Sequence, residues 1–456
     1  MLKGLTSDSR NVKPGYLFAA LPGERLDGHN YIPQALSQGA TAILYDGSVE
    51  LENHITALQV PRENLHKNFA KLTGKFYNAQ PEWAVAVTGT NGKSSVVEFI
   101  SQIWNSIGVK GQAIGTLSGT LTTPDPVTLH ETLKSLQNDG ITHVALEASS
   151  HGLAQFRMDG MKVQIAAFTN LSQDHLDYHK TMNEYLSCKA RLFTEVLTNA
   201  GIAILNADCP EYQTLQAICD AREITVLSYG RQADTIVLKN VEIEGFSQRC
   251  EIEVMGKHYA FLFPLIGEFQ IMNALCALGC IIAQKDVDAN DAIEALENLK
   301  SVKGRLQNIT NKTQTLHAYV DYAHTPDALK TVLQTLRPYT KKRLVCVFGC
   351  GGDRDQDKRE QMGKIATAYA DHVIITDDNP RNENPDKIRA EIKQGAASAV
   401  EISDRREAIS HAVQLLEYGD VLLVAGKGHE QGQIIGDQIK EFDDFTEVTS
   451  VLVDRE

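Results

Sequence analysis

The sequence lacks the features of a membrane-spanning or nucleic-acid-binding protein. Its 456 residues contain no stretch of about 18 consecutive apolar side chains, so we expect no transmembrane helix. The N-terminal segment MLKGLTSDSRNVKPG has no apolar core, and we expect no secretory signal peptide. Lysine and arginine together number 44 against 58 aspartates and glutamates, a formal net charge of −14. This charge argues against broad binding to nucleic acids or membrane surfaces, although it allows a local basic pocket.

The sequence also has no C-x-x-C pair, which argues against a zinc ribbon. Low-complexity tracts and internal repeats are absent as well. We expect the cysteines to be small buried thiols in a reducing compartment. The eight are Cys188, Cys209, Cys219, Cys250, Cys276, Cys280, Cys346 and Cys350.

The order of apolar and amphipathic segments predicts an α/β protein. At roughly 150 residues per domain, the length suggests about three domains. Residues 1–80 carry short strand and helix signals, and QPEW at 80–83 is typical of a linker because proline interrupts regular elements. The pattern VKGR at 302–305 indicates a second boundary. We therefore predict domains over 1–80, 81–305 and 306–456.

The middle segment alternates apolar strands with amphipathic helices, which is typical of βαβ units around a parallel sheet. The predicted strands lie at 84–89, 143–149, 165–170 and 201–206, and the predicted helices at 273–284 and 289–300. In the last segment, each apolar strand ends in a polar, glycine-rich loop. Open parallel sheets bind ligands at the carboxyl ends of their strands, so these loops are candidate site regions.

The stretch GTNGKSS at 89–95 follows an apolar run and precedes an amphipathic segment. Main-chain N–H groups in such a turn, at the start of a helix, bind phosphate oxygens. Lys93 would neutralise the outer phosphates, and the Ser94 hydroxyl would be a Mg²⁺ ligand. The general phosphate-loop motif has glycine where Val87 stands, so the alternative is a simple glycine-rich turn with a surface lysine.

Two further segments of the middle region carry candidate chemistry. Glu147, in LEASSHG at 146–152, ends an apolar strand and could hold a cation or be a solvated acid. Residues 170–193 crowd Asp174, His175, Asp177 and His179 into one loop, which raises a zinc hydrolase as an alternative, but H-E-x-x-H spacing is absent.

Lys189 lies on the amphipathic helix that follows this loop, next to apolar residues. A lysine in this pattern is commonly one whose stem lies on the protein while its ammonium stays in water. The sequence alone leaves open whether Lys189 is such a surface residue.

Four loops of the last segment bring carboxylates, guanidinium groups and glycines together. They are DYAHTPD at 321–327, GCGGDRD at 349–355, DDNPR at 377–381 and GKGHE at 426–430. Arginine binds a carboxylate and Asp or Glu binds an ammonium, so this composition suits a zwitterionic small molecule.

These four loops and GTNGKSS, in this order, resemble the Mur ligase family of cytoplasmic peptidoglycan synthesis. The resemblance runs from TSDSRNVKPGYLFAALPGERLDGHNYI to GKGHEQGQIIG, nearly the whole chain. Within the family, the match is similar to the ligases that add a third amino acid to UDP-N-acetylmuramoyl-L-alanyl-D-glutamate. DNPR with Arg381 resembles the form that uses meso-2,6-diaminopimelate.

The resemblance implies an N-terminal α/β domain that binds the uridine nucleotide, a central P-loop ATPase domain with a parallel sheet, and a C-terminal Rossmann-like domain. It implies an ATP- and Mg²⁺-dependent ligase that is cytoplasmic and monomeric and that binds neither nucleic acid nor membrane. It also implies a CO₂-derived carbamate on Lys189.

The resemblance also assigns residues. The implied ATP-binding residues are Gly89, Thr90, Asn91, Gly92, Lys93, Ser94, Ser95, Asn273, Arg305 and Asp321. The implied residues for the UDP-linked substrate are Ser7, Ser9, Glu24, Arg25, Leu26, Thr122, Thr123, Ser149, Gln155, Arg157 and His324. The implied diaminopimelate residues are Arg354, Asp378, Asn379, Pro380, Arg381, Gly426 and Glu430. The implied magnesium ligands are Ser94, Glu147, His175 and carbamoylated Lys189, and the implied catalytic residues are Lys93, Glu147, His175 and Lys189.

Some positions depart from the family pattern. Gln270 stands where asparagine is usual, and VKGRLQ at 302–307 replaces a Pro-Gly-Arg-Met-Glu run. These departures concern fine nucleotide contacts rather than the reaction. Three alternatives remain at this point: a lysine-adding ligase on the same nucleotide, a folylpolyglutamate-synthase-like ligase, and a catalytically silent nucleotide-binding protein.

Overall fold

The computed structural model describes residues 2–23, 26–119, 121–174, 176–284 and 287–455. The chain forms two compact units, each described by itself. The first comprises Met1–Asn240, Glu251–Phe261 and Met272–Leu296, and the second comprises Val241–Cys250, Leu262–Ile271 and Glu297–Glu456. Among the described residues, no helix is long and apolar enough to cross a membrane.

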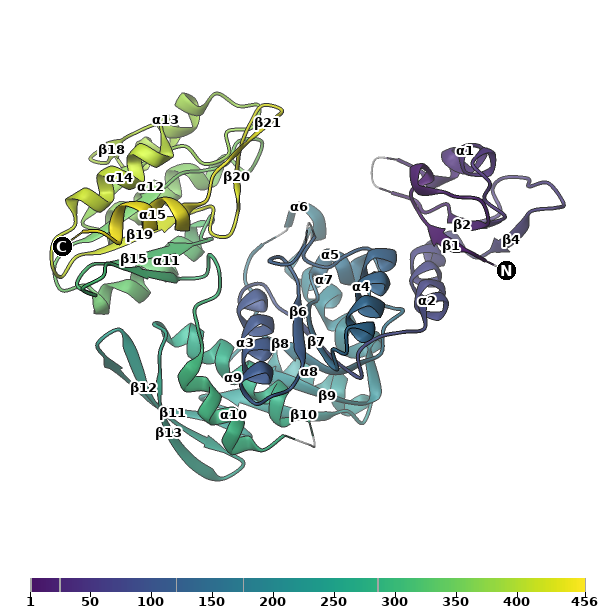
Figure 1. The fold of residues 1–456 in the computed structure, drawn as a ribbon, viewed down its shortest axis with the longest axis horizontal. Helices are drawn as coiled ribbons and strands as arrows, with labels where there is room; N and C mark the ends of the chain where they lie inside the picture. The colour runs from purple at the N-terminus through teal and green to yellow at the C-terminus, as the bar shows by residue number, and fades with distance from the viewer. Residues whose placement is uncertain (1, 24–25, 120, 175, 285–286, 456) are drawn as a thin grey trace. The chain divides into compact units, whose positions relative to one another are not determined.

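The N-terminal part of the first unit is a four-stranded parallel sheet in the order β1-β2-β3-β4 (Figure 1). Helix α2 packs its buried residues Leu65 and Phe69, one helical turn apart, into the core of this part. The helix ends where Asn78 adopts a left-handed conformation with φ 44°. The elements are β1 (Gly4–Thr6), β2 (Tyr16–Ala19), α1 (Ile32–Ser37), β3 (Ala42–Tyr45), β4 (Thr56–Gln59) and α2 (Leu65–Tyr77).

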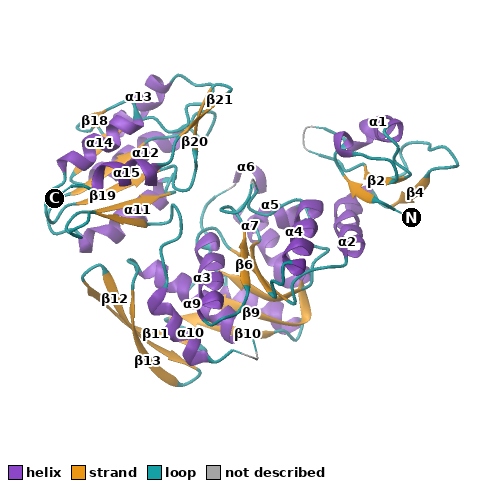
Figure 2. Ribbon diagram, viewed as in Figure 1, coloured by secondary structure: helices purple, strands orange, loops and turns teal. Residues whose placement is uncertain are grey.

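A nine-stranded sheet follows, in the order β13-β12-β11-β10-β9-β8-β5-β7-β6 (Figures 1 and 2). Its strands from β6 to β11 pair in parallel, as the alternating sequence pattern predicts. The strands are β5 (Trp83–Thr88), β6 (Gly111–Ile114), β7 (His143–Glu147), β8 (Val163–Phe168), β9 (Leu197–Asn206), β10 (Thr225–Gly230), β11 (Ile236–Glu244), β12 (Ser247–Val254) and β13 (Lys257–Phe263). The helices are α3 (Lys93–Ser106), α4 (Pro126–Asn138), α5 (Ser150–Ala154), α6 (Leu176–His179), α7 (Met182–Arg191), α8 (Tyr212–Ala221), α9 (Glu268–Ile282) and α10 (Ala289–Ala295).

Three boundaries differ from the sequence expectation. The predicted linker at 80–83 overlaps β5, which begins at Trp83. Helix α9 begins at Glu268 rather than 273, because the apolar pattern extends further toward the N-terminus than the segment that signalled the helix. The predicted helix over 289–300 is α-helical only as far as Ala295 and tightens into a 3₁₀ turn over Leu296–Asn298.

The second unit contains a six-stranded sheet in the order β14-β15-β19-β16-β17-β18, where only β14 is antiparallel. Alternate residues of β16 enter two separate hydrophobic clusters, so helices cover both faces of the sheet. Helices α11, α12 and α13 pack on one face, and α14 and α15 on the other. The elements are β14 (Gln307–Thr310), β15 (His317–Asp321), α11 (Pro326–Leu336), β16 (Leu344–Phe348), α12 (Asp357–Tyr369), β17 (His372–Ile375), α13 (Pro385–Gly395), β18 (Val400–Glu401), α14 (Arg405–Leu415), β19 (Val421–Ala425), β20 (Gly432–Ile435), β21 (Gln438–Glu441) and α15 (Asp444–Leu452).

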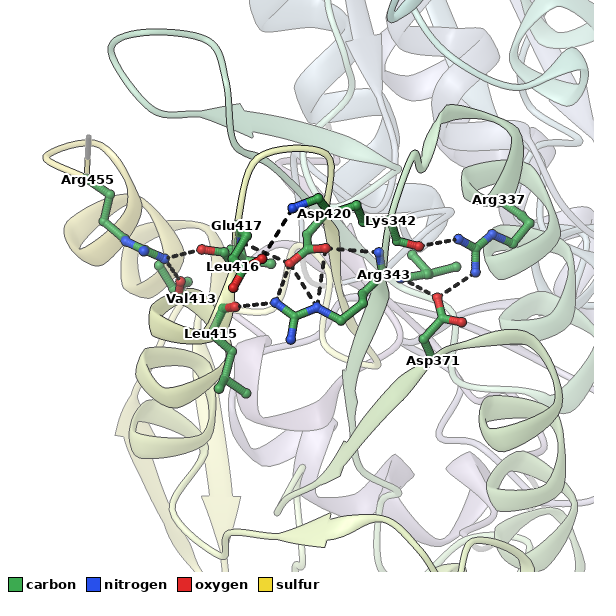
Figure 3. Close-up of polar contacts among 11 residues, drawn as sticks. Arg337, Lys342, Arg343, Asp371, Val413, Leu415, Leu416, Glu417, Asp420 and Arg455 are labelled. Atoms are coloured by element: carbon green, nitrogen blue, oxygen red, sulfur yellow. Dashed lines mark hydrogen bonds and ion pairs between the residues drawn. The ribbon is translucent and has the colours of Figure 1, made fainter.

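Polar contacts connect the amino ends of these strands (Figure 3). The candidate site loops lie at the opposite, carboxyl ends of the strands. Arg343 and Asp420, which precede β16 and β19, form an ion pair of 2.6 Å. Asp371, which precedes β17, accepts a 2.7 Å hydrogen bond from the Leu344 N–H. Burial alone would raise the pKa of Asp420, but the Arg343 guanidinium and main-chain donors hold it below its usual value. The contacts at this end of the sheet are structural, whereas the candidate site loops follow the carboxyl ends of the strands.

The cysteines agree only in part with the expectation that all of them are small buried thiols. All eight are free thiols, and six of them are buried. Cys188 and Cys209 are only partly buried.

Candidate active site

The phosphate-loop candidate occupies the turn between the buried strand β5 and the start of α3. Gly92 has φ +87°, and a Cβ atom there would lie 2.4 Å from Oδ1 of Asn273. The position therefore requires glycine both for its backbone conformation and for the approach of Asn273. The turn thus brings together GTNGKSS and Asn273, two of the sequence-assigned ATP elements.

Two lysines converge on this turn. Lys93 Nζ donates to the main-chain oxygens of Gly89 at 3.0 Å and Thr90 at 2.8 Å. Lys189 Nζ, from α7, donates to the same Gly89 oxygen at 2.8 Å. Lys189 is only 1 % exposed, so its interpretation as a surface lysine is wrong. Its Nζ contacts the phosphate loop and the Tyr185 ring instead of solvent.

The environment of Lys189 disfavours its charged form. Burial is the largest cause that lowers its pKa well below the usual value, and the nearby positive charge of Lys93 lowers it further. The ring of Tyr185 lies 4.2 Å from Lys189 Nζ, and burial raises the pKa of Tyr185 to about 12. Lys189 is therefore biased toward a neutral, nucleophilic amine.

Glu147 ends β7 beside the phosphate loop and is 1 % exposed. Its Oε1 accepts hydrogen bonds from the Ser94 hydroxyl at 2.9 Å and from the Thr116 N–H at 2.8 Å. The parallel pairing of β5 with β7, in which Val87 is opposite Glu147, produces this proximity. The solvated-acid interpretation of Glu147 is therefore wrong, because the side chain is buried and hydrogen-bonded.

The residues assigned to the muramoyl-dipeptide form one network with Glu147. The Thr123 hydroxyl donates to the Glu147 main-chain oxygen at 2.7 Å and lies 2.9 Å from the Ser149 hydroxyl. Arg157 donates to the Thr123 main-chain oxygen at 2.6 Å and to Gln155 Oε1 at 2.7 Å. The fifth residue, Thr122, has its hydroxyl 3.0 Å from that of Thr116. All five are therefore linked through hydrogen bonds to the main chain of Glu147 or, through Thr116, to its carboxylate.

The residues that hold the phosphate loop in place were not predicted from the sequence. The Thr169 hydroxyl donates to the Asn91 main-chain oxygen at 2.6 Å, and Asn170 Oδ1 accepts from the Asn91 N–H at 3.0 Å. The Thr90 hydroxyl in turn accepts from the Ser172 N–H at 3.0 Å. The signal was available, because β8 ends at Phe168 and pairs directly with β5, which puts residues 169–172 beside the loop.

The structure describes only some of the implied magnesium ligands, because His175 lies outside the described residues. Glu24 and Arg25, which are implied for the UDP-linked substrate, also lie outside them. Within the described part of the chain, no group of three or more His, Cys, Asp or Glu side chains is arranged to hold a metal ion. Ser94 and Glu147 nevertheless present hard oxygen donors side by side, and these fit Mg²⁺.

The remaining N-terminal assignments differ in exposure. Ser7 and Leu26 are exposed and accessible to a ligand. Ser9 is buried, and its hydroxyl donates to Gln34 Oε1 at 3.0 Å. The Ser9 hydroxyl thus connects the turn at Ser9–Asn11 to helix α1.

In the second unit, Asp321 ends β15 and is buried. Its carboxylate accepts from the N–H groups of Leu306 at 2.7 Å and Ala323 at 2.8 Å. Burial raises the pKa of Asp321, although Arg305 and these main-chain donors oppose the rise. The Arg305 guanidinium lies 4.8 Å from the centre of the Tyr322 ring, and His324 Nδ1 lies 2.9 Å from the Tyr322 main-chain oxygen. Asp321, Arg305 and His324 thus belong to one cluster.

The DNPR loop follows β17 and meets the loop after β19. Asn379 Nδ2 donates to Glu430 Oε2 at 2.8 Å. Gly426 has φ +114°, and a Cβ atom there would lie 2.8 Å from Asp378 Oδ2. Pro380 is buried, whereas Arg354 is exposed. The two loops thus bring Asp378, Asn379 and Glu430 together, as their positions after parallel strands suggested.

Arg381 is held in an uncommon backbone conformation, with φ 51°. Its main chain is held by the β20–β21 hairpin, because the Arg381 N–H donates to the Ile434 oxygen at 3.0 Å and the Gly436 N–H, in the turn after β20, donates to the Arg381 oxygen at 2.7 Å. Its guanidinium donates to the Gly352 main-chain oxygen at 2.8 Å. Strain of this kind, imposed by surrounding structure, is common at functional sites. The supporting β20–β21 hairpin was not assigned a role from the sequence.

Comparisons with known proteins cover nearly the whole chain. Residues 2–82 match the profile described as Mur ligase family, catalytic domain; residues 87–281 match the Mur ligase middle domain; and residues 304–428 match the Mur ligase, glutamate ligase domain. A relative from Rhizobium meliloti (strain 1021) is 47 % identical over 98 % of this chain and 94 % of its own. A relative from Caulobacter vibrioides is 44 % identical over 99 % and 96 %. Both are named UDP-N-acetylmuramoyl-L-alanyl-D-glutamate--2,6-diaminopimelate ligase.

Solved structures agree. A structure with that same ligase name is 33 % identical, covers 99 % of this chain and 94 % of its own, and superposes with a TM-score of 0.72. A MurF ligase from Thermotoga maritima in complex with ADP shares the fold at 20 % identity, with a TM-score of 0.65 over 93 % of this chain and 94 % of its own. The three matched segments and the phosphate loop, strand-end carboxylate and C-terminal loops described above agree on one conclusion: this chain belongs to the Mur ligase family.

Proposed function

We propose that this protein is an ATP-dependent amide ligase that adds meso-2,6-diaminopimelate to UDP-N-acetylmuramoyl-L-alanyl-D-glutamate. The observation that carries the proposal is the near full-length relationship, at 44 to 47 % identity, to relatives named for this reaction. The DNPR loop with Arg381 in place supports the choice of amino acid. The product of the reaction is a precursor of peptidoglycan. Through peptidoglycan, the reaction supports cell shape and cell division.

The chemistry starts from a carboxylate, which is a poor electrophile because oxide cannot leave. Transfer of the γ-phosphoryl group of ATP to the D-glutamyl carboxylate makes an acyl phosphate. The neutral amine of diaminopimelate attacks its carbonyl carbon, and the tetrahedral intermediate expels phosphate to leave an amide. The protein contributes mainly by positioning the reactants and by neutralising charge.

Several groups of the first unit suit the phosphoryl transfer. The main chain of Gly89–Gly92 and the start of α3 would hold the phosphates, and Lys93 would release its loop contacts to bind them. Ser94 and Glu147, with His175 and a carbamate on Lys189, would hold Mg²⁺. When bound, Mg²⁺ offsets the repulsion between ATP and the carboxylate.

The burial of Lys189 supports the carbamate proposal. A neutral amine is required to attack CO₂, and the N–C bond forms with loss of one proton. Burial and the neighbouring Lys93 favour that neutral form. The product replaces a cation with an anion that offers two oxygens.

The loops of the second unit suit diaminopimelate. Arg381 and Arg354 would bind its carboxylates, and Asp378 and Glu430 would bind its distal ammonium. Asp321, Arg305 and His324 belong to the nucleotide and substrate contacts in this proposal. The proposal also includes domain boundaries near residues 80 and 305. It further includes a cytoplasmic location and a monomeric state.

The proposal is tested by phosphate release from ATP and Mg²⁺ with the UDP-linked dipeptide, in parallel with meso-diaminopimelate, L-lysine or no amino acid. Release only with diaminopimelate is expected. Release with lysine would keep the ligase and overturn the amino-acid assignment. No release in any arm would overturn the proposed substrate, and a folate with glutamate would be the next pair to test.

A further inference from the structure

Lys427 is a completely buried lysine, with 0 % of its surface exposed. Its Nζ donates to Asn379 Oδ1 at 2.9 Å and lies 3.4 Å from Glu430 Oε2 and 3.6 Å from Asp378 Oδ1. Lysine is rarely buried unless it is paired, and here one ammonium faces three oxygen atoms. These oxygens come from two different loops, one after β17 and one after β19.

The three partners of Lys427 are all residues assigned to diaminopimelate. They are also connected to one another, because Asn379 Nδ2 donates to Glu430 Oε2 at 2.8 Å. Asn379 Oδ1, which accepts from Lys427, also accepts from the Ile434 N–H at 3.0 Å. The ammonium therefore fixes the orientation of the Asn379 amide and, through it, of the Glu430 carboxylate.

Lys427 also balances the charge of the pocket. Asp378 and Glu430 bring two carboxylates to the same place, and like charges this close repel. The lysine offsets one of these charges, which leaves one net negative charge among the three groups. One negative charge matches one ligand ammonium, the distal one, while the attacking amine has to be neutral.

Other buried cations of this unit make their direct ion pairs elsewhere. Arg405 is fully buried and its ion-pair partner is Asp444, at 2.6 Å, although the charges of Asp378 and Glu430 also raise the pKa of Arg405. Arg359 is equally buried, and its partners are Glu383 and Glu391. Lys427 differs because its side-chain partners Asn379, Glu430 and Asp378 all belong to the assigned amino-acid pocket.

We infer that Lys427 is a positioning residue that sets the affinity of this site for its amino-acid substrate, by orienting Asn379 and Glu430 and by offsetting one of the two pocket carboxylates. The inference rests on the proposed function, because it concerns how the amino acid is bound. Lys427 touches none of the reacting atoms in this account. Its loss should therefore weaken binding of the amino acid much more than it slows turnover.

The test compares full-length Lys427→Met and Lys427→Arg with the wild type in steady-state phosphate release. In Lys427→Met, the KM for diaminopimelate should rise roughly tenfold to 100-fold, while kcat and the KM values for ATP and the UDP-linked dipeptide stay within about threefold. Lys427→Arg keeps the charge, but the longer guanidinium cannot keep all three contacts in a fully buried position, so a rise of roughly threefold to tenfold is expected. Lys440→Met, at an exposed lysine of β21, should match the wild type.

The outcomes separate this inference from the proposed function. If the wild type does not turn over with diaminopimelate, the proposed function fails before Lys427 is considered. If the wild type is active and Lys427→Met keeps its KM for diaminopimelate, the inference alone is overturned. An equal fall in kcat/KM for all three substrates would also overturn it, because that pattern indicates a merely structural role. If Lys427→Met does not fold, the KM of Lys427→Arg decides: a rise of threefold or more supports the inference, and a wild-type value overturns it.

Discussion

Lys93 and Lys189 donate hydrogen bonds to the same main-chain oxygen, that of Gly89, at 3.0 and 2.8 Å. Two ammonium groups at one acceptor repel each other, and Lys189 is the more deeply buried of the two. The pair therefore favours loss of a proton from Lys189, which is the form that the proposed carbamate requires.

The first prediction is that Lys189 carries a carbamate. Protein equilibrated with ¹³C-labelled bicarbonate should give one slowly exchanging carbamate carbon signal by NMR. Lys189→Ala should lack this signal and lose activity by on the order of 100-fold. A wild-type spectrum without the signal, or a signal that persists in Lys189→Ala, would contradict the assignment.

The second prediction concerns Glu147. Glu147→Gln keeps an oxygen that can accept from Ser94 and Thr116 but removes the negative charge. The Mg²⁺ concentration for half-maximal activity should therefore rise by about tenfold or more, while the melting temperature changes little. A titration of activity against Mg²⁺ measures this, with Glu184→Gln at an exposed position of α7 as the control. An unchanged Mg²⁺ requirement would remove Glu147 from the metal site.

The third prediction concerns Arg381. Arg381→Ala should raise the KM for diaminopimelate by about 30-fold or more, corresponding to about 2 kcal/mol, because a buried carboxylate of the substrate loses its partner. Binding of the UDP-linked dipeptide should be unchanged, as measured by calorimetry. Arg406→Ala, at an exposed arginine that pairs with Glu447 in the same unit, is the control. Wild-type kinetics with diaminopimelate would show that the pocket is assigned wrongly.

The fourth prediction concerns acid stability of the N-terminal part. Arg62 pairs with Asp27 and, at 2.9 Å, with Asp46. The Arg62 guanidinium, with donors from His29, lowers the pKa of Asp27 to about 2. Because the folded pKa lies below the usual value of 3.8, this stabilisation is present above about pH 4 and is lost as the pH falls toward 2.

Arg62→Gln should accordingly lower the melting temperature of the N-terminal part by a few degrees at pH 7. The difference in melting temperature from the wild type should shrink between pH 4 and 2. Lys13→Gln, at an exposed position of the same part, should show no such pH-dependent difference. A difference that stays constant down to pH 2 would mean that the ion pair with Asp27 is not its source.

The positions of many candidate residues could be predicted from the sequence. Glu147, Asp321 and Asp378 follow short apolar runs, and such runs in βαβ order put their carboxyl ends at one edge of a parallel sheet. The resemblance of the loop motifs to one family then suggested roles. Both signals are local in sequence, which is why they could be seen without coordinates.

Other features depend on contacts between distant residues. The burial of Lys427 and Lys189 results from packing against segments that neither local pattern specifies, so a surface lysine was a reasonable expectation for Lys189. The support of Asn91 by Thr169 and Asn170 needs the pairing of β5 with β8. The left-handed Arg381 is imposed by its bonds to Ile434 and Gly436, which no propensity for arginine would indicate.

The central claim is that the D-glutamyl carboxylate is phosphorylated by ATP, and following an oxygen atom of that carboxylate tests it most directly. The UDP-linked dipeptide is prepared with ¹⁸O in the D-glutamyl carboxylate that becomes the amide, and the enzyme is run with ATP, Mg²⁺ and meso-diaminopimelate. Attack of that carboxylate on the γ-phosphorus predicts one ¹⁸O atom in each released phosphate, and one diaminopimelate in each product molecule, by mass spectrometry. Phosphate without the label would contradict an acyl-phosphate ligase, and with it the account of how this site uses ATP.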